Sequence, residues 1–187
     1  MKHSFANKFI IIIALFFLTA CATSGVSVKV SKFDNSKEIV LIPAWVISNK
    51  MYLGLTYRSS KPEEIILKVG LSSYNNTGNI QGVFFNINGE IISAIPVENL
   101  KQTEKNIDLT NGNCYTYAGV TTCQSGMSQV RKERLFIIPA SLPKKILDSN
   151  TAYIRISSDG DNIEIDLKND GGDFIKLLPK FVANIQK

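Results

Sequence analysis

The sequence predicts a mainly β protein, built as an antiparallel sandwich or an open barrel of short hairpins. Roughly ten short segments rich in β-branched and aromatic residues are separated by turn residues. Three pairs of these segments flank two-residue turn sequences that favour hairpins. Helical periodicity is confined to two places, residues 141–148 and the C-terminal stretch.

Five segments outside the hairpins have the composition of β-strands. Each is short, rich in Val, Ile, Leu or Tyr, and bounded by polar or turn residues. They are 26–30, 38–42, 52–57, 65–71 and 135–138. The spacing of these segments favours a sandwich or open barrel over βαβ units.

The first hairpin turn is Asn88-Gly89, between segments 83–87 and 90–95. Asn-Gly suits a tight two-residue turn because both residues tolerate positive φ. Pro96 lacks a backbone N–H, so we expect it to end this ladder.

The second hairpin is centred on Ala118-Gly119 and carries the cysteines Cys114 and Cys123. In a two-residue hairpin this register places the two cysteines opposite each other, at a spacing that suits a disulfide. A disulfide is also the simplest state for a cysteine pair in an oxidising compartment, and closing this loop should contribute about 2.5–3 kcal/mol on the chain-entropy model.

Tyr115 and Tyr117 lie on the other face of the same hairpin, together with Val120 and Thr122. Two tyrosines on a disulfide-linked hairpin would make a rigid partner-binding surface. The alternative is that both rings pack on the sheet of their own domain.

The third hairpin turns at Asp159-Gly160. Its register pairs Ile156 with Ile163 on one face and Arg155 with Glu164 on the other. The apolar pair on one face and the oppositely charged pair on the other are both consistent with a turn at Asp159-Gly160.

Two segments predict helices. Ser141 can cap a short helix near 141–148, where Pro143 is tolerated in the first turn. The C-terminal stretch has an apolar stripe at helical spacing. Its members are Phe174, Leu177, Leu178, Phe181, Val182 and Ile185. Pro179 predicts a kink or a helix that begins near Leu178. The stripe either packs on the sheet or forms a detachable helix for a partner or a membrane surface.

The N-terminus has the order of a secretory signal. Lys2 and Lys8 precede the apolar run 9–18, which is followed by Thr19 and Ala20. This run has ten residues, whereas a membrane-spanning helix needs about 20. A permanent transmembrane span is therefore not expected.

The sequence Leu18-Thr19-Ala20-Cys21 resembles the lipobox of bacterial lipoprotein precursors. The resemblance implies cleavage between Ala20 and Cys21, with lipid joined to the Cys21 sulfur and usually to the new amino group. Several acyl chains hold a protein at a bilayer almost permanently. In organisms that sort lipoproteins by the next residue, Ala22 favours the outer membrane, facing the periplasm.

This resemblance divides the chain into a signal peptide at 1–20, a lipidated tether at 21–30 and a single β-rich domain at 31–187. The signal peptide carries two of the 21 basic residues and none of the 16 acidic residues. The mature chain therefore keeps only a small positive charge. Its basic residues are scattered, which excludes nucleic acid as the expected partner.

The single histidine, His3, belongs to the signal peptide. A mature domain without histidine cannot use Ser-His-Asp or Cys-His catalysis and lacks the commonest zinc ligand. Serine with lysine, as in Ser60-Lys61 or Ser141 with Lys144, has no recognisable nucleophile motif. We therefore predict no catalytic residue and no cofactor.

Acidic residues give no clear site either. Adjacent Glu63 and Glu64 would point to opposite faces of a strand, and Asp159 with Asp161 belongs to a turn. The segments 159–162 and 169–173 contain oxygen ligands for calcium but lack EF-hand spacing. No metal is expected.

These observations predict a non-catalytic envelope module, held at a membrane by its lipid, that binds an envelope protein or peptidoglycan. One alternative is an inhibitor of a secreted hydrolase such as lysozyme, since small disulfide-linked lipoproteins that inhibit lysozyme are similar to this chain in size and in expected location. A less favoured alternative is a hydrolase of envelope polymer that works without histidine.

Overall fold

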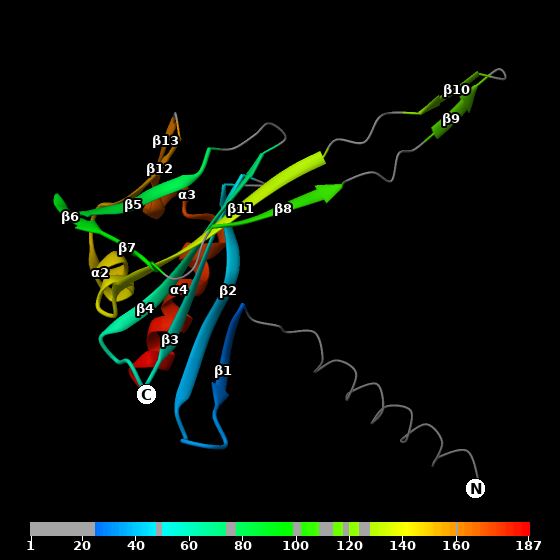
Figure 1. Ribbon diagram of the computed structural model, residues 1–187. Coiled ribbons are helices and arrows are strands. Elements are labelled where there is room, and N and C mark those ends of the chain that lie inside the picture. Colours follow the sequence, from blue (N-terminus) through cyan, green and yellow to red (C-terminus); the bar gives the residue numbers. More distant parts are fainter. Residues whose placement is uncertain are drawn as a thin grey trace, which may run out of the picture.

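The structure is a computed structural model that describes residues 25–47, 50–73, 78–98, 102–108, 114–117, 120–123, 128–159 and 161–187. It confirms the mainly β class (Figure 1). An antiparallel seven-stranded sheet and an antiparallel four-stranded sheet carry the core; one helix lies between β11 and β12 in the chain, and two follow the last strand. The arrangement is an open pair of sheets and not a closed barrel.

The larger sheet has the order β1-β2-β3-β4-β11-β7, and β8 also pairs with β11. Its strands are β1 (Val26–Val30), β2 (Lys37–Ile47), β3 (Met51–Arg58), β4 (Glu64–Ser73), β7 (Ile95–Pro96), β8 (Thr103–Asp108) and β11 (Ser128–Pro139). Residues 26–30 are expected both in a strand and in the lipidated tether at 21–30. Because these residues pair with β2, 26–30 belongs to the sheet and not to a tether.

The smaller sheet has the order β13-β12-β5-β6. Its strands are β5 (Ile80–Ile87), β6 (Glu90–Ser93), β12 (Ala152–Ser158) and β13 (Asp161–Asp166). A separate hairpin contains β9 (Cys114–Tyr117) and β10 (Val120–Cys123). Figure 1 places this hairpin beyond the ends of β8 and β11, away from the two larger sheets.

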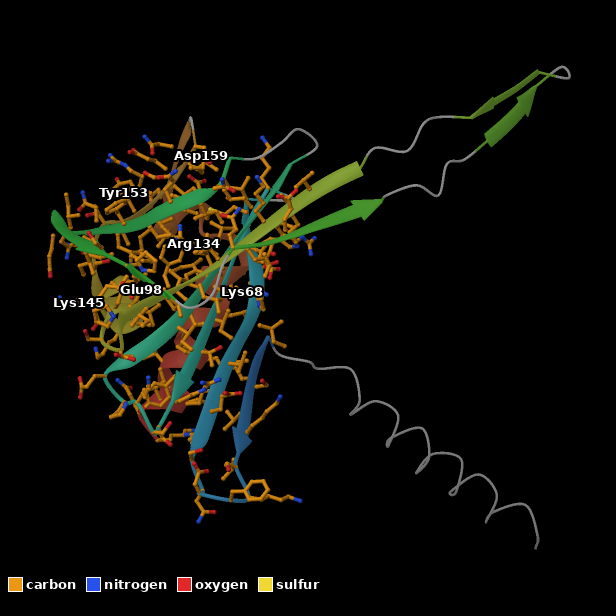
Figure 2. The ribbon with its side chains drawn as sticks, in the orientation of Figure 1. Lys68, Glu98, Arg134, Lys145, Tyr153 and Asp159 are labelled. Carbon is orange, nitrogen blue, oxygen red and sulfur yellow. The ribbon has the colours of Figure 1, made fainter. Side chains whose placement is uncertain are left out.

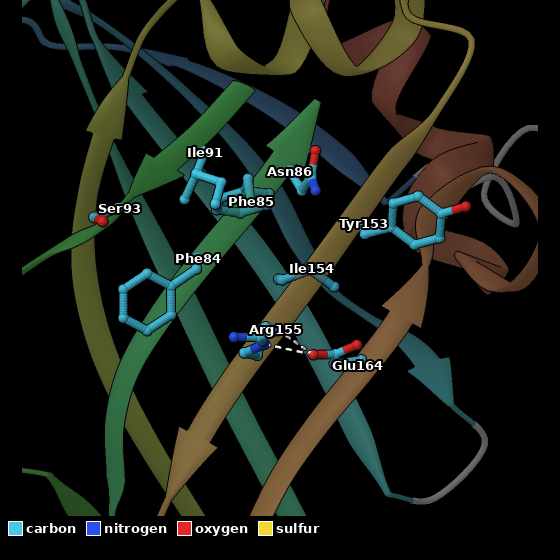
Figure 3. A pocket seen from close by; sticks show the side chains of 9 residues that line it. All are labelled: Phe84, Phe85, Asn86, Ile91, Ser93, Tyr153, Ile154, Arg155 and Glu164. Carbon is cyan, nitrogen blue, oxygen red and sulfur yellow. Dashed lines mark hydrogen bonds and ion pairs between the residues drawn. The ribbon is translucent and has the colours of Figure 1, made fainter. Parts of the chain in front are cut away.

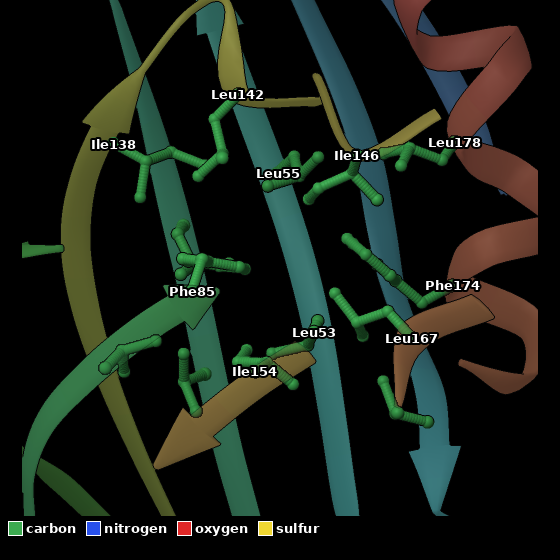
Figure 4. Packing of buried hydrophobic residues seen from close by; sticks show 14 of the residues in the cluster. Leu53, Leu55, Phe85, Ile138, Leu142, Ile146, Ile154, Leu167, Phe174 and Leu178 are labelled. Carbon is green, nitrogen blue, oxygen red and sulfur yellow. The ribbon is translucent and has the colours of Figure 1, made fainter. Parts of the chain in front are cut away.

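The core lies between the larger sheet and a second layer that contains the smaller sheet, α2 (Leu142–Asp148) and α4 (Gly172–Ile185). Figure 4 shows side chains from both layers meeting there, for example Leu53 of β3 and Phe85 of β5. Along the strands, buried apolar residues alternate with residues of the outer faces. This alternation leaves one face of each sheet outside the core.

The structure confirms the predicted registers of the hairpins at 88–89 and 159–160. Asn88 and Gly89 have φ values of 50° and 91°, as a turn with two positive φ angles requires. The expected role of Pro96 is wrong. The chain leaves the smaller sheet at Ala94, and Pro96 pairs with Phe136 in the larger sheet. A proline is tolerated there because β7 lies at a sheet edge.

The short helix α2 is confirmed, but the predicted cap is wrong. Ser141 has helical dihedral angles, φ −74° and ψ −19°, and its side chain makes no capping hydrogen bond. An N-cap side chain reaches the free N–H groups from an extended conformation, which Ser141 does not adopt.

The C-terminal helix α4 begins at Gly172, so the expected start near Leu178 is wrong. Gly172 has φ +53°, and its backbone lies against the carbonyl oxygens of Trp45 and Val46, where a Cβ would clash. This glycine lets the helix start close to β2 and continue through Pro179. The buried members of its stripe, Phe174, Leu178 and Phe181, confirm packing on the core.

Candidate functional site

The outer face of the four-stranded sheet carries the main candidate site. Residues on the inner face of β5 and β12, such as Phe85 and Ile154, are buried in the core. Their neighbours Phe84, Tyr153 and Arg155 therefore lie on the opposite face. Strand alternation alone places these three side chains together.

A hollow of about 540 Å³ opens on this face (Figure 3). The residues that line it come from four strands. They are Phe84, Phe85, Asn86, Ile91, Ser93, Tyr153, Ile154, Arg155 and Glu164. The register places Asn86 between Tyr153 and Ile91, and Phe84 between Arg155 and Ser93.

Apolar groups of this face remain accessible. Ile91 is 70% exposed and Tyr153 is 42% exposed, while Phe84 is half-buried. Exposed aliphatic and aromatic side chains that gather on one face are typical of an interaction surface. The hollow therefore offers apolar area that the fold itself does not use.

An ion pair forms one side of the hollow. Arg155 Nη2 lies 2.5 Å from Glu164 Oε1, in the cross-strand pair that the Asp159-Gly160 turn predicts. Both side chains are more than half exposed, so the pair contributes little to stability. Its oriented donors and acceptors are available to a ligand at the edge of the apolar area.

Hydrogen bonds fix the turn between β5 and β6, next to the lining residues Asn86 and Ile91. Asn88 Oδ1 accepts from the N–H groups of Asn150 and Thr151, 3.1 and 3.0 Å away. Asn86 Oδ1 accepts from Gly89 N–H at 2.9 Å. These contacts tie the turn to the start of β12, so the lining strands are held in a fixed arrangement.

A second cluster lies on the outer face of the seven-stranded sheet, across β2, β3 and β11. The rings of Trp45 and Tyr52 meet edge to face with centroids 5.2 Å apart. The Arg131 guanidinium carbon lies 5.7 Å from the Trp45 centroid and 5.3 Å from the Tyr52 centroid. Such cation–π contacts stabilise the side chains that make them.

Tyr52 and Glu133 of this second cluster are paired within the chain, whereas the buried Arg131 Nε has no hydrogen-bond partner among the residues that the structure describes. The Tyr52 hydroxyl donates to Glu133 Oε1, and Lys68 Nζ lies 2.5 Å from Glu133 Oε2. Burial and the hydrogen bond to Glu133 raise the pKa of Tyr52 above its usual range. Burial opposes ionisation of Glu133, but the hydrogen bonds from Lys68 and Tyr52 outweigh it and lower the pKa of this carboxyl.

The predicted hairpin at 118–119 has the expected register. Cys114 lies opposite Cys123, and Tyr115 lies opposite Thr122. The side chains of β9 and β10 lie outside the described residues, so the disulfide and the tyrosine surface stay predictions. Ala20 and Cys21 also lie outside the described residues.

Asp159 acts in a polar network at a turn. Its carboxylate accepts hydrogen bonds from Asn79 N–H at 3.0 Å and from the Gln81 side chain, which lower its pKa. Asp166, at the start of α3 (Leu167–Asp170), accepts from Lys168 N–H at 2.8 Å and caps that helix. The segment 169–173 forms the junction between α3 and α4.

The described ranges contain neither a metal-binding cluster nor a membrane-spanning helix. No group of three or more His, Cys, Asp or Glu side chains there is arranged to hold a metal ion. No helix among those residues is both long and apolar enough to span a bilayer.

The sequence reveals only half of the main site. The turns at 88–89 and 159–160 predict which residues of each hairpin face outward, including Arg155 and Glu164. They do not predict that β5 pairs with β12, because about 60 residues separate these strands and no local signal specifies such a pairing. Phe84 and Tyr153 are therefore missed by sequence reasoning.

Comparisons with protein-family models, with curated proteins and with solved structures found no match to this chain.

Proposed function

We propose that this chain is a lipid-anchored module of the bacterial envelope that binds a protein partner through the outer face of its four-stranded sheet. The observation that carries the proposal is the hollow with its exposed apolar side chains, chiefly Ile91 and Tyr153. The partner is expected in the envelope because the lipobox-like sequence at 18–21 implies export and lipid attachment at Cys21.

The face has the composition of a protein interface. Interfaces combine an apolar centre rich in aromatic residues with a polar rim, and Tyr and Arg are frequent hot spots. Here Phe84, Ile91 and Tyr153 supply the apolar part. An ion pair lies toward its edge, Arg155 with Glu164.

A protein fits this face better than an enclosed small molecule does. Small-molecule sites bury most of the ligand surface. In this hollow Ile91 stays largely exposed and the floor is a sheet, so a ligand would contact it from one side. A partner that brings its own apolar surface would cover both Ile91 and Tyr153.

Photo-cross-linking in the native envelope tests this proposal. The full-length chain receives a photo-reactive residue in place of Tyr153, with a matched variant at exposed Lys176 of α4. Figure 2 places Tyr153 on the smaller sheet. We expect one protein to be captured from position 153 and not from position 176, and the capture to disappear when Ile91→Asp is added. Equal capture from both positions, or capture that survives Ile91→Asp, would contradict the proposal.

Intact-mass analysis tests the anchor separately. We expect the mature chain to lack residues 1–20 and to carry acyl chains on Cys21. Retention of residues 1–20, or an unmodified Cys21, would refute the anchor while leaving the cross-linking result interpretable.

A further inference from the structure

We propose that the β1–β2 hairpin is a second membrane contact, which lays the edge strand β1 against a bilayer that contains anionic lipid. This inference rests on the lipid anchor of the proposed function. It adds an orientation: the anchored domain would lie with β1 along the membrane and would not hang freely from its tether.

Exposed apolar side chains gather on this hairpin. Val28 is 44% exposed, Val30 is 61% exposed, and Phe33 in the connecting loop is fully exposed. Val28 and Val30 are two residues apart on one strand, so they share a face. Scattered exposed apolar residues are ordinary, but three within six residues of an edge hairpin form an apolar tip.

The loop that presents Phe33 is held by its own hydrogen bonds. Ser31 N–H donates to Ser36 O at 2.9 Å, and Asn35, with φ 53°, donates to Ser31 O at 3.1 Å. Asp34 Oδ1 accepts from Ser36 N–H at 3.1 Å. The exposure of Phe33 is therefore a property of a hydrogen-bonded turn.

Positive charge accompanies the apolar tip. Lys29, on the other face of β1 from Val28 and Val30, and Lys32 in the loop are exposed, and Lys37 begins β2. A hollow of about 330 Å³ at the base of the loop is lined by three basic residues, Lys29, Lys37 and Arg58, and by one acidic residue, Glu38, among others. Lysines near an anionic bilayer attract its phosphate groups, and apolar side chains beside them enter the boundary between headgroups and acyl chains.

The charges at this hollow are held in place. Lys37 Nζ donates to the Asn184 carbonyl at 2.7 Å, and Arg58 Nε lies 2.8 Å from Glu38 Oε2. The first contact fixes the hairpin against the end of α4, and the second fixes it against β3. These two contacts attach the hairpin to the rest of the domain.

The place of the anchor in the chain favours the same orientation. Cys21 precedes Gly25 by four residues, which span at most about 14 Å when extended. β1 begins at Val26 and is the outermost strand of its sheet, as Figure 1 shows. A domain held this close to a bilayer can rest β1 and its loop on the surface.

Protection of a sheet edge explains only part of this pattern. Lysines on an edge strand discourage pairing with another chain, which accounts for Lys29. Edge protection does not account for a fully exposed aromatic ring in the adjoining loop. A membrane contact accounts for both the lysines and Phe33.

The test uses the full lipidated chain in vesicles that contain brominated phospholipid, a short-range quencher of tryptophan fluorescence. One variant carries Phe33→Trp. A matched control carries Lys144→Trp on α2, which follows β11 on the other side of the sheet from β1 and has an exposed side chain at this position. The unsubstituted chain gives the background of Trp45. We expect quenching at position 33 to exceed that at position 144 by about twofold or more, because an interfacial side chain lies within about 10 Å of the acyl boundary.

A second comparison tests the charges. Adding Lys29→Glu and Lys32→Glu to the Phe33→Trp variant should roughly halve the quenching on anionic vesicles, while zwitterionic vesicles should show little change. Equal quenching at positions 33 and 144, or no response to the charge reversals, would overturn the inference. Quenching absent at position 33 while mass analysis finds lipid on Cys21 would refute this inference alone. An unlipidated Cys21 would refute the anchor.

Discussion

The outer faces of the two sheets use aromatic residues in different ways. On the seven-stranded sheet, Tyr52 is buried against Gly70, its hydroxyl is bonded to Glu133, and Arg131 lies against its ring. On the four-stranded sheet, Tyr153 and Phe84 line an open hollow. Lys68 and Tyr153 mark the two regions in Figure 2.

The two faces contribute to different properties: the Tyr52 contacts stabilise the fold, and the Tyr153 face is available for binding. The contacts of Tyr52 are made within the chain, so they favour the folded state whether or not a partner is present. The exposed area around Tyr153 gains contacts only when something covers it. Exposure and internal pairing therefore indicate which aromatic surface is available for function, although both lie on outer faces of sheets.

The largest expected effect comes from Phe85→Ala, which sharpens the contrast between the two sides of β5. Phe85 is buried between the sheets, so its truncation leaves a cavity and should cost about 3–5 kcal/mol of unfolding free energy. Chemical denaturation measures this loss. A cost below about 1 kcal/mol would show that the two sheets do not share a packed core.

Gly70→Ala should disrupt the internally paired face. A Cβ at Gly70 would lie well inside contact distance of the Tyr52 ring, so the ring must move and lose its place against Arg131. We expect a loss of up to about 3 kcal/mol, typical of overpacking. Thermal unfolding measures this loss, and Ser60→Ala is the control. Gly89→Ala would not serve as a control, because Gly89 has positive φ and the substitution there is itself strained.

Acid should weaken the same face through Glu133. Its pKa is lowered in the folded state, so its contribution to stability is present above pH about 4.5 and is lost as the pH falls through the lowered value. Glu133→Gln should reduce stability at pH 7 by about 1.5 kcal/mol, as for a lost bond to a charged group.

The pH dependence distinguishes this role from simple packing. Between pH 7 and pH 3, denaturation of Glu133→Gln should show a smaller decrease in stability than the unaltered chain. Glu64→Gln, at an exposed residue whose oxygen lies 3.9 Å from Lys61 Nζ, is the matched control and should follow the unaltered chain. A parallel decrease in all three proteins would contradict the role of Glu133.

The smallest effect on stability is expected for Phe84→Ala, one residue from Phe85. Phe84 lies on the open face and is only half-buried, so its truncation should cost about 1 kcal/mol, well below the cost at Phe85. Cross-linking of the partner from position 153 should nevertheless fall strongly. If Phe84→Ala destabilised the chain as much as Phe85→Ala, the open face would be part of the core and the contrast between the sides of β5 would fail.

Local sequence predicted the elements with the strongest short-range signals. Turns at 88–89 and 159–160 set the registers of their hairpins because two residues with suitable φ determine which strand residues face each other. β8 was missed, since Thr103–Asp108 is mostly polar and becomes a strand only by pairing with β11. The start of α4 was missed because Gly172 is fitted to the carbonyls of β2, far away in sequence.

The sequence by itself determined the β class, the hairpin registers, the apolar stripe of the last helix and the expectation of a lipid anchor. These features depend on residue type and on spacing within a few residues. Tertiary structure decided that β5 pairs with β12, and that aromatic residues on the outer face of the larger sheet are enclosed while those on the outer face of the smaller sheet are open. The reason is that pairing and burial depend on surfaces brought together from distant parts of the chain, whose complementarity no local pattern records.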